Sequence, residues 1–102
     1  MSKAKPNRFL SEPELELVAV RFRALGEPMR LRVLRAVCHQ PRTVNEIVEA
    51  VGSGQANVSK HLALLAGAGI LARQKSGQRV IYRLKDSLAL KLCKTVRAHL
   101  GA

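Results

Sequence analysis

The sequence has few aromatic residues, few cysteines and no long hydrophobic run, and each shortage excludes a class of protein. Its three aromatic residues, Phe9, Phe22 and Tyr82, are too few for the stacking platforms of single-strand nucleic-acid binders. Two cysteines, Cys38 and Cys93, cannot build a disulfide framework. No apolar stretch approaches the ~20 residues that span a bilayer, and no secretory signal is seen. We therefore expect a cytoplasmic protein without a membrane partner.

Acidic residues are also scarce, above all in the second half of the chain. The 102 residues include 18 Lys and Arg against 7 Asp and Glu, which gives a formal net charge of +11. From residue 50 onward, Asp86 is the one acid opposing nine basic residues. Such an excess attracts a polyanion, and nucleic acid best matches a dense cationic face. The alternative is a charged surface that only keeps the protein soluble.

The chain has room for one domain, in which helix signals dominate. Residues 1–10 are polar and basic, and we expect a flexible arm there, with the domain over 11–102. Capping boxes at 11–14 and 43–46, a proline at 28 and the Asp86-Ser87 pair predict helix starts, and glycines at 26, 52 and 67 predict helix ends. Another helix is predicted over 55–66, and strands over 71–75 and 79–84 flank a Ser-Gly-Gln turn.

The order of these elements indicates a fold class. It is mainly α with a small β-hairpin, namely five helices and a two-stranded wing in the order of a winged helix-turn-helix. In this fold the third and fourth helices form the helix-turn-helix pair, and the hairpin forms the wing. The fourth helix is then the one that enters the DNA major groove.

The outward face of the fourth helix suits base contacts. Its polar residues, none of them acidic, are Gln55, Asn57, Ser59, Lys60 and His61. Gln and Asn can form two bonds to adenine, Lys reaches guanine acceptors, and Ser and His bond to bases or phosphates. The alternative is an ordinary solvated helix face, although such faces usually mix Glu with Lys.

The predicted hairpin, together with a basic residue before the third helix, supplies candidates for phosphate contacts. They are Arg42, Arg73, Lys75, Gln78 and Arg79. Basic side chains near a flexible tip can lie along phosphates or enter the minor groove. The alternative is that these side chains are exposed only because they keep the protein soluble.

Four segments in order carry a family resemblance. They are Leu25-Gly26-Glu27-Pro28-Met29-Arg30-Leu31, Val58-Ser59-Lys60-His61-Leu62, Ala68-Gly69-Ile70-Leu71 and Gly77-Gln78-Arg79-Val80-Ile81-Tyr82-Arg83-Leu84. Over about residues 15–100 the chain resembles ArsR/SmtB-type winged helix-turn-helix transcriptional repressors. The resemblance implies a homodimer paired through its first and last helices. It also implies sequence-specific binding to a palindromic operator in double-stranded DNA and release by an inducer.

The resemblance also points to two common metal sites. One places cysteines at the start of the third helix, where residues 43–47 contain no thiol. The other uses both ends of the last helix, where Asp86 and His99 match but Leu88 and Ala102 stand in the remaining positions. Helix capping is the alternative role for Asp86, and an exposed helix end is the alternative for His99.

The two cysteines are the other candidate sensors. Soft thiolates at Cys38 and Cys93 suit a metalloid, copper(I) or a redox or sulfur switch. Both positions fall on apolar stripes of predicted helices, so inert packing is the alternative. No cofactor is certain; a metal or metalloid inducer is a candidate.

No catalytic constellation or phosphate-binding loop occurs, so we do not expect an enzyme. Two other functions stay open. The first is an architectural protein that coats DNA without sequence preference. The second is a protein-interaction module with an incidental basic face.

Overall fold

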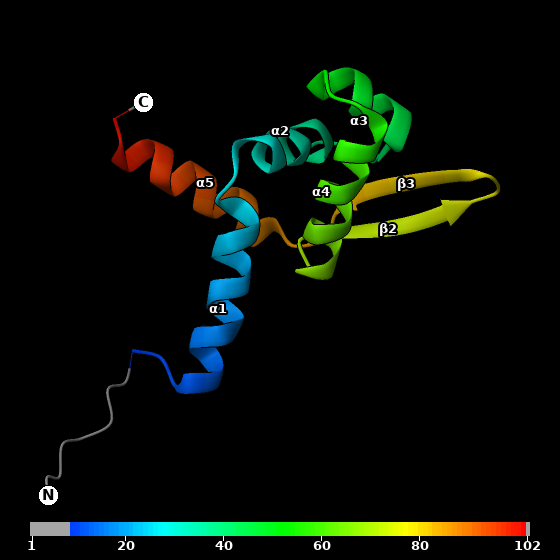
Figure 1. Cartoon of the computed structure of the whole chain (residues 1–102). Coiled ribbons are helices and arrows are strands. Elements are labelled where there is room, and N and C mark those ends of the chain that lie inside the picture. The colour runs from blue at the N-terminus through cyan, green and yellow to red at the C-terminus, as the bar shows by residue number, and fades with distance from the viewer. Residues whose placement is uncertain (1–8, 102) are drawn as a thin grey trace, which may run out of the picture.

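The computed structural model describes residues 9–101 and confirms the predicted helix order (Figure 1). Residues 1–8 of the expected basic arm lie outside the described residues. Within 9–101 the elements are α1 (Glu12–Leu25), α2 (Pro28–Val37), β1 (Arg42–Thr43), α3 (Val44–Val51), α4 (Gln55–Gly67), β2 (Leu71–Ser76), β3 (Arg79–Leu84) and α5 (Ser87–His99). We call residues 28–84 the winged unit, and we call α1 and α5 the outer helices.

Both predicted capping boxes are confirmed. At the start of α1 the Ser11 hydroxyl accepts the Glu14 N–H at 3.3 Å, and the Glu14 carboxylate accepts the Ser11 N–H at 2.8 Å. Thr43 and Glu46 repeat this exchange before α3, at 3.2 and 2.8 Å. Each box satisfies amides that have no partner inside the helix, which is why these helices begin where they do.

The sheet differs from the expected two-stranded wing. It has three antiparallel strands in the order β1-β3-β2, because the two residues of β1 pair with β3 at Arg42↔Tyr82 and Thr43↔Ile81. The hairpin itself runs from Leu71↔Leu84 to Ser76↔Arg79. Its two-residue turn has a positive φ (63°) at Gly77 and at no other turn residue, a conformation that favours glycine at the first position. The added strand fastens the base of the wing to the start of α3.

The hydrophobic core lies inside the winged unit. Each of its helices and both hairpin strands contribute fully buried or nearly buried side chains: Val33, Leu34, Val37, Ile47, Val58, Leu62, Leu65, Leu71 and Tyr82. The inward residues of α4 recur at helical spacing, so one face of that helix is held while the opposite face stays free. The core therefore fixes the orientation of α4 relative to the wing.

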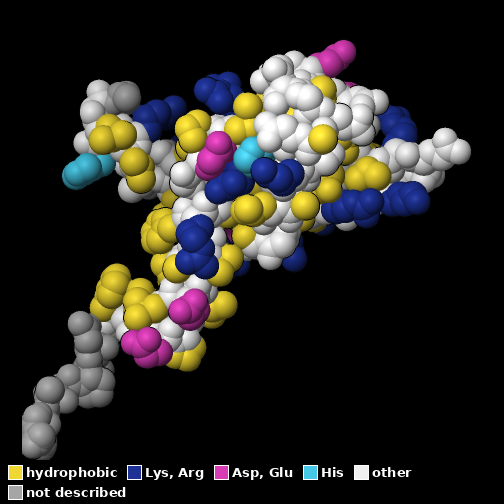
Figure 2. Space-filling view, in the orientation of Figure 1, with side chains coloured by type: hydrophobic (Ala, Val, Ile, Leu, Met, Phe, Trp, Pro, Cys, Tyr) yellow, Lys and Arg dark blue, Asp and Glu magenta, His cyan; other side chains and the backbone are white. Residues whose placement is uncertain are grey.

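The outer helices contribute little to this core. Among their residues the buried hydrophobic ones are Ala24 in α1 and Ala89 in α5. Phe22 is 57% exposed, Val96 is 56% exposed and Leu100 is 74% exposed. Figure 2 shows hydrophobic side chains along α1 and near the end of α5, outside the winged unit.

An apolar groove runs between the outer helices and the start of the winged unit. It has a volume of about 370 Å³, and its walls include Phe22, Leu25, Leu31, Leu92 and Val96. Phe22 and Leu25 of α1 therefore face a groove that one copy of the chain does not fill.

Candidate nucleic-acid interface

The free face of α4 presents four of the five predicted base-contacting residues. Gln55, Asn57, Ser59 and Lys60 are all exposed. The Asn57 amide donates to the Ser53 hydroxyl at 3.0 Å, which orients its carbonyl oxygen. No side chain caps the N-terminus of α4 at Gly54, so its first amides remain available to an anion.

His61 is a correction to the sequence prediction. Its side chain is 7% exposed and lies on the inward face of α4, beside the core residues Val58, Leu62 and Leu65. Its Nδ1 atom is 3.4 Å from an Nη atom of Arg30 on α2. The prediction was wrong because His61 belongs to the apolar i, i+3, i+4, i+7 stripe, and that spacing was visible in the sequence. His61 is therefore not placed to contact a base.

The wing carries the predicted cationic side chains on its surface. Arg73 and Lys75 on β2, Gln78 in the turn and Arg79 at the start of β3 are all exposed. Arg73 and Lys75 lie two residues apart on one strand, so they project from the same side of the hairpin. Figure 2 shows Lys and Arg side chains along the wing, away from the hydrophobic outer helices.

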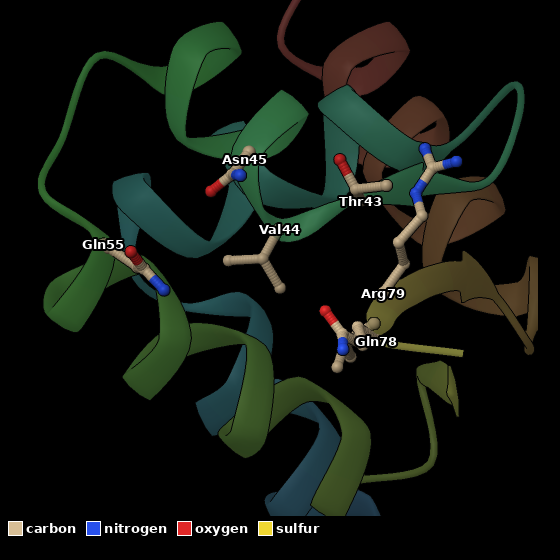
Figure 3. Close-up of a pocket in the computed structure, with 7 residues that line it drawn as sticks. Thr43, Val44, Asn45, Gln55, Gln78 and Arg79 are labelled. Atoms are coloured by element: carbon tan, nitrogen blue, oxygen red, sulfur yellow. The ribbon is translucent and has the colours of Figure 1, made fainter. Parts of the chain in front are cut away.

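A polar notch of about 350 Å³ joins the wing to the helix-turn-helix. Figure 3 shows Asn45 from α3 and Gln55 from α4 on one side, with Gln78 and Arg79 from the wing on the other. Thr43 and Val44 also line it. Asn45 was not among the predicted contact residues, although an exposed amide at the second position of a capped helix is a usable signal. The notch brings the start of both helix-turn-helix helices and the wing to one surface.

Glu46, which follows the notch residue Asn45, is held by its own helix. The pKa of Glu46 is lowered, mainly because its carboxylate accepts the Thr43 backbone N–H, with smaller contributions from the Thr43 hydroxyl and from the charges of Arg42 and Arg79. Its negative charge is thus directed at the α3 N-terminus and at neighbouring arginines. The surface around the notch consequently stays favourable for an anion.

Arg42 is tied into the fold. Its Nε donates to the Ala36 carbonyl at 2.8 Å. When the Gln40 amide is oriented with its oxygen towards the guanidinium, that oxygen lies 3.1 and 3.2 Å from the two terminal nitrogens. These bonds join the end of α2 to β1. The Arg42 guanidinium is therefore engaged within the fold and is not proposed to contact phosphate.

The two candidate metal ligands are not brought together within one chain. Asp86 caps α5, where its carboxylate accepts the Leu88 N–H at 2.9 Å, and it also pairs with Arg21 at 3.7 Å. His99 ends the same helix, so the axial rise along α5 separates it from Asp86 by about 20 Å. Among residues 9–101 no three His, Cys, Asp or Glu side chains cluster as a metal site requires.

The two thiols lie in different surroundings. The prediction that Cys38 lies on the inner face of α2 was wrong, because α2 ends at Val37 and Cys38 is its half-buried C-cap. The Cys38 thiol donates to the Arg35 carbonyl at 3.3 Å. Cys93 is half-buried, packs against the core and lines the groove between the outer helices.

Across residues 9–101, none of the helices combines the length and apolar character that crossing a membrane requires. The helix-turn-helix formed by α3 and α4 lies beside a cationic hairpin. This arrangement defines the class of winged helix-turn-helix DNA-binding proteins.

Comparison with known proteins gives the family. The model of the family "Bacterial regulatory protein, arsR family" matches residues 27–73. The HTH-type transcriptional repressor SmtB of Mycobacterium tuberculosis is 34% identical over 98 residues, which cover 96% of this chain and 70% of that protein.

Solved structures agree with the family match. The crystal structure of M. tuberculosis Rv0081 superimposes with a TM-score of 0.77 at 32% identity, covering 89% of this chain and 92% of that one. The homodimeric winged helix-turn-helix domain of Mb0332 from Mycobacterium bovis shares the fold, with a TM-score of 0.78 at 24% identity over 93% and 91% of the two chains. The chain belongs to the ArsR/SmtB family and is a DNA-binding transcriptional repressor, not an enzyme.

Proposed function

We propose that this repressor works in the cytoplasm as a homodimer, paired through α1 and α5, on a palindromic operator. The groove between the outer helices supports the pairing, because exposed apolar surface of this kind marks an interaction site. A second copy brings matching apolar side chains in a two-fold arrangement. The solved Mb0332 domain, which shares this fold, is a homodimer.

The operator contacts follow from the exposed face of α4 and the wing. Gln55, Asn57, Ser59 and Lys60 contact base edges in the major groove. Arg73, Lys75, Gln78 and Arg79 contact phosphates, and Asn45 reaches the backbone from the notch. The observation that carries this proposal is the notch, which places an uncapped α4 N-terminus beside a cationic wing.

A selected duplex tests the contacts. Wild-type protein selects a palindromic duplex from a random pool, and fluorescence anisotropy then measures the affinity of variants across a range of salt concentrations. Gln55→Ala and Asn57→Ala should each cost about 1–3 kcal/mol on the selected duplex and little on a scrambled one. Arg73→Ala, Lys75→Ala and Arg79→Ala should weaken both duplexes alike and each reduce the salt slope by about 0.9.

Lys94→Ala is the matched control, because Lys94 is an exposed cation on α5 outside the proposed contact set. It should leave both the affinity and the salt slope unchanged. Equal wild-type affinity for selected and scrambled duplexes would favour an architectural role. If no duplex bound at modest salt, the basic face would be incidental and a protein partner would be favoured.

We also propose that an inducer releases the repressor from its operator. The candidates are a metal held by Asp86 and His99 across the dimer, and a metalloid, oxidant or sulfur species that reacts at Cys38 or Cys93. Release is measured with zinc, nickel, arsenite, peroxide and persulfide. Loss of release in Cys38→Ser or Cys93→Ser would assign a thiol, and loss in His99→Ala alone would assign the metal. Release by none of these compounds would contradict the inducer proposal for this set.

A further inference from the structure

The attachment of α1 to the rest of the molecule is narrow. Figure 1 shows α1 projecting away from the winged unit, and Ala24, near its C-terminal end, is its one buried residue. Arg30 on α2 holds this same end. Its Nε donates to the Ala24 carbonyl at 2.7 Å, and one Nη donates to the Arg23 carbonyl at 2.9 Å. The Arg23 carbonyl also accepts the Gly26 N–H at 3.2 Å. Carbonyls in the last turn of a helix lack the usual N–H partner four residues on, so a guanidinium is a strong cap for them.

The same guanidinium reaches the reading helix α4. Its other Nη lies 3.4 Å from the Nδ1 atom of His61, which is 7% exposed. Arginine has donors and no acceptor, so a hydrogen bond at this contact requires a neutral ring with Nδ1 as the acceptor and its proton on Nε2. His61 directly follows Lys60, so this contact lies beneath the face proposed to contact bases.

Glu27 completes the arrangement at the start of α2. Its carboxylate accepts the Arg30 backbone N–H at 2.9 Å. This bond is the main reason that the pKa of Glu27 is lowered, and the charge of Arg30 adds to the effect. Arg30 is thus fixed at its backbone while its side chain bridges the end of α1 and the inward face of α4.

We propose that Arg30 and His61 are positioning residues that set the angle between α1 and α4, and thereby the separation of the two reading helices in the dimer. The inference rests on the proposed pairing through the outer helices. Directional hydrogen bonds constrain an angle in a way that sliding apolar contacts do not. The pair accordingly determines which spacing between operator half-sites the repressor accepts, and it leaves the contacts within each half-site unchanged.

Three variants separate this role from simple packing. His61→Asn keeps an acceptor oxygen close to the position of Nδ1, whereas His61→Leu removes the acceptor and retains similar bulk. Arg30→Lys keeps the charge but loses the planar fork that holds two carbonyls and the imidazole together. Each variant is compared with wild type on three duplexes: the selected palindrome, the palindrome with one base pair inserted between its halves, and a single half-site. The insertion moves one half by about 3.4 Å and rotates it by about 35°.

We expect wild type and His61→Asn to prefer the uninterrupted palindrome over the inserted one at least tenfold. His61→Leu and Arg30→Lys should lose most of that preference while binding the half-site within twofold of wild type. Thermal unfolding and sedimentation report folding and dimerisation for each variant. If His61→Leu and Arg30→Lys fold, dimerise and keep the wild-type spacing preference, the pair does not position the helices. Equal impairment in His61→Asn would also overturn the proposal.

A spectroscopic measurement gives an independent test. In wild-type protein whose His61 ring is in its neutral form, the ¹⁵N chemical shifts of the ring should show an unprotonated Nδ1 and a protonated Nε2. A protonated Nδ1 would overturn the inference without affecting the proposed operator binding. By contrast, a wild-type protein that sediments as a monomer, or selects no palindrome, would overturn the proposed function and this inference with it.

Discussion

The winged unit and the outer helices use hydrophobic residues in opposite ways. In the winged unit, Leu62, Ile47 and Val33 are completely buried. In the outer helices, alanines are buried while larger residues such as Phe22 and Val96 stay exposed. Burying an alanine removes little apolar area from water, so the outer helices gain little from this contact alone. The winged unit therefore has a complete hydrophobic core within one chain. The outer helices need contact with a second protein surface to bury their large apolar side chains.

The largest expected effect tests the hydrophobic core of the winged unit. Leu62→Ala should lower the free energy of unfolding by about 2–5 kcal/mol, because it leaves a cavity among buried side chains. Leu64→Ala is the matched control on the same helix, since Leu64 is 43% exposed, and it should change stability by less than about 1 kcal/mol. Denaturant unfolding at one fixed protein concentration measures both values. Similar losses in the two variants would contradict a core confined to the inner face of α4.

A somewhat smaller effect tests the proposed pairing of the outer helices. Phe22→Lys should weaken dimerisation by about 2 kcal/mol, roughly thirty-fold in Kd, because it places a charge in the apolar groove. Sedimentation over a range of concentrations measures the dissociation constant. Ala50→Lys adds the same charge to an exposed position of α3 and serves as the control. An unchanged dimer in Phe22→Lys would show that pairing uses another surface.

The two capping boxes allow the same chemistry to be compared in both regions. Thr43→Ala should cost about 1 kcal/mol in global unfolding, because α3 belongs to the cooperative core. Ser11→Ala removes the equivalent bond from α1, but we expect it to increase hydrogen exchange in the first turn of that helix with little change in global stability. A global loss in Ser11→Ala as large as that in Thr43→Ala would show that α1 unfolds together with the winged unit.

The smallest effect concerns acid pH. The pKa values of Glu14 and Glu46 are both lowered, chiefly by backbone hydrogen bonds at their capping boxes. A lowered folded-state pKa contributes stability above the ordinary value of 4.5, and this contribution is lost as the pH falls through the lowered value. Glu46→Gln should therefore flatten the decline of global stability below pH 4.5 more than Glu14→Gln does. Thermal unfolding between pH 3 and 7 measures this, and parallel curves for both variants and wild type would contradict it.

Local signals explain how much of this fold could be predicted. Capping boxes and glycines act within a few residues, so the starts and ends of α1 and α3 followed from the sequence. The end of α2 at Val37 has no such signal and was not predicted. The strand β1 has no such signal, because two residues become a strand only through pairing with Tyr82 and Ile81 far along the chain. The same limit applies to Arg30, whose partners on α1 and α4 come together only in the tertiary structure.

Helical periodicity also predicted which polar residues of α4 are exposed, except at His61. Gln55, Asn57, Ser59 and Lys60 face outward as the helical period requires. His61 was assigned by its chemistry, a polar ring among polar neighbours, when its place in the period indicated the opposite face. Periodicity is therefore the stronger guide wherever a residue type suits both a core and a surface.

The short pairing between β1 and β3 has a consequence for how such repressors diversify. Because the hairpin is fastened at Tyr82 and Ile81, the strand pairs nearer the tip, from Lys75↔Val80 outward, have no third strand beside them within residues 9–101. Insertions or exchanges around Gly77 would leave the fastened base intact. Sequence change at the tip would then alter the proposed phosphate contacts of Gln78 and Arg79 without disturbing the strands that support them.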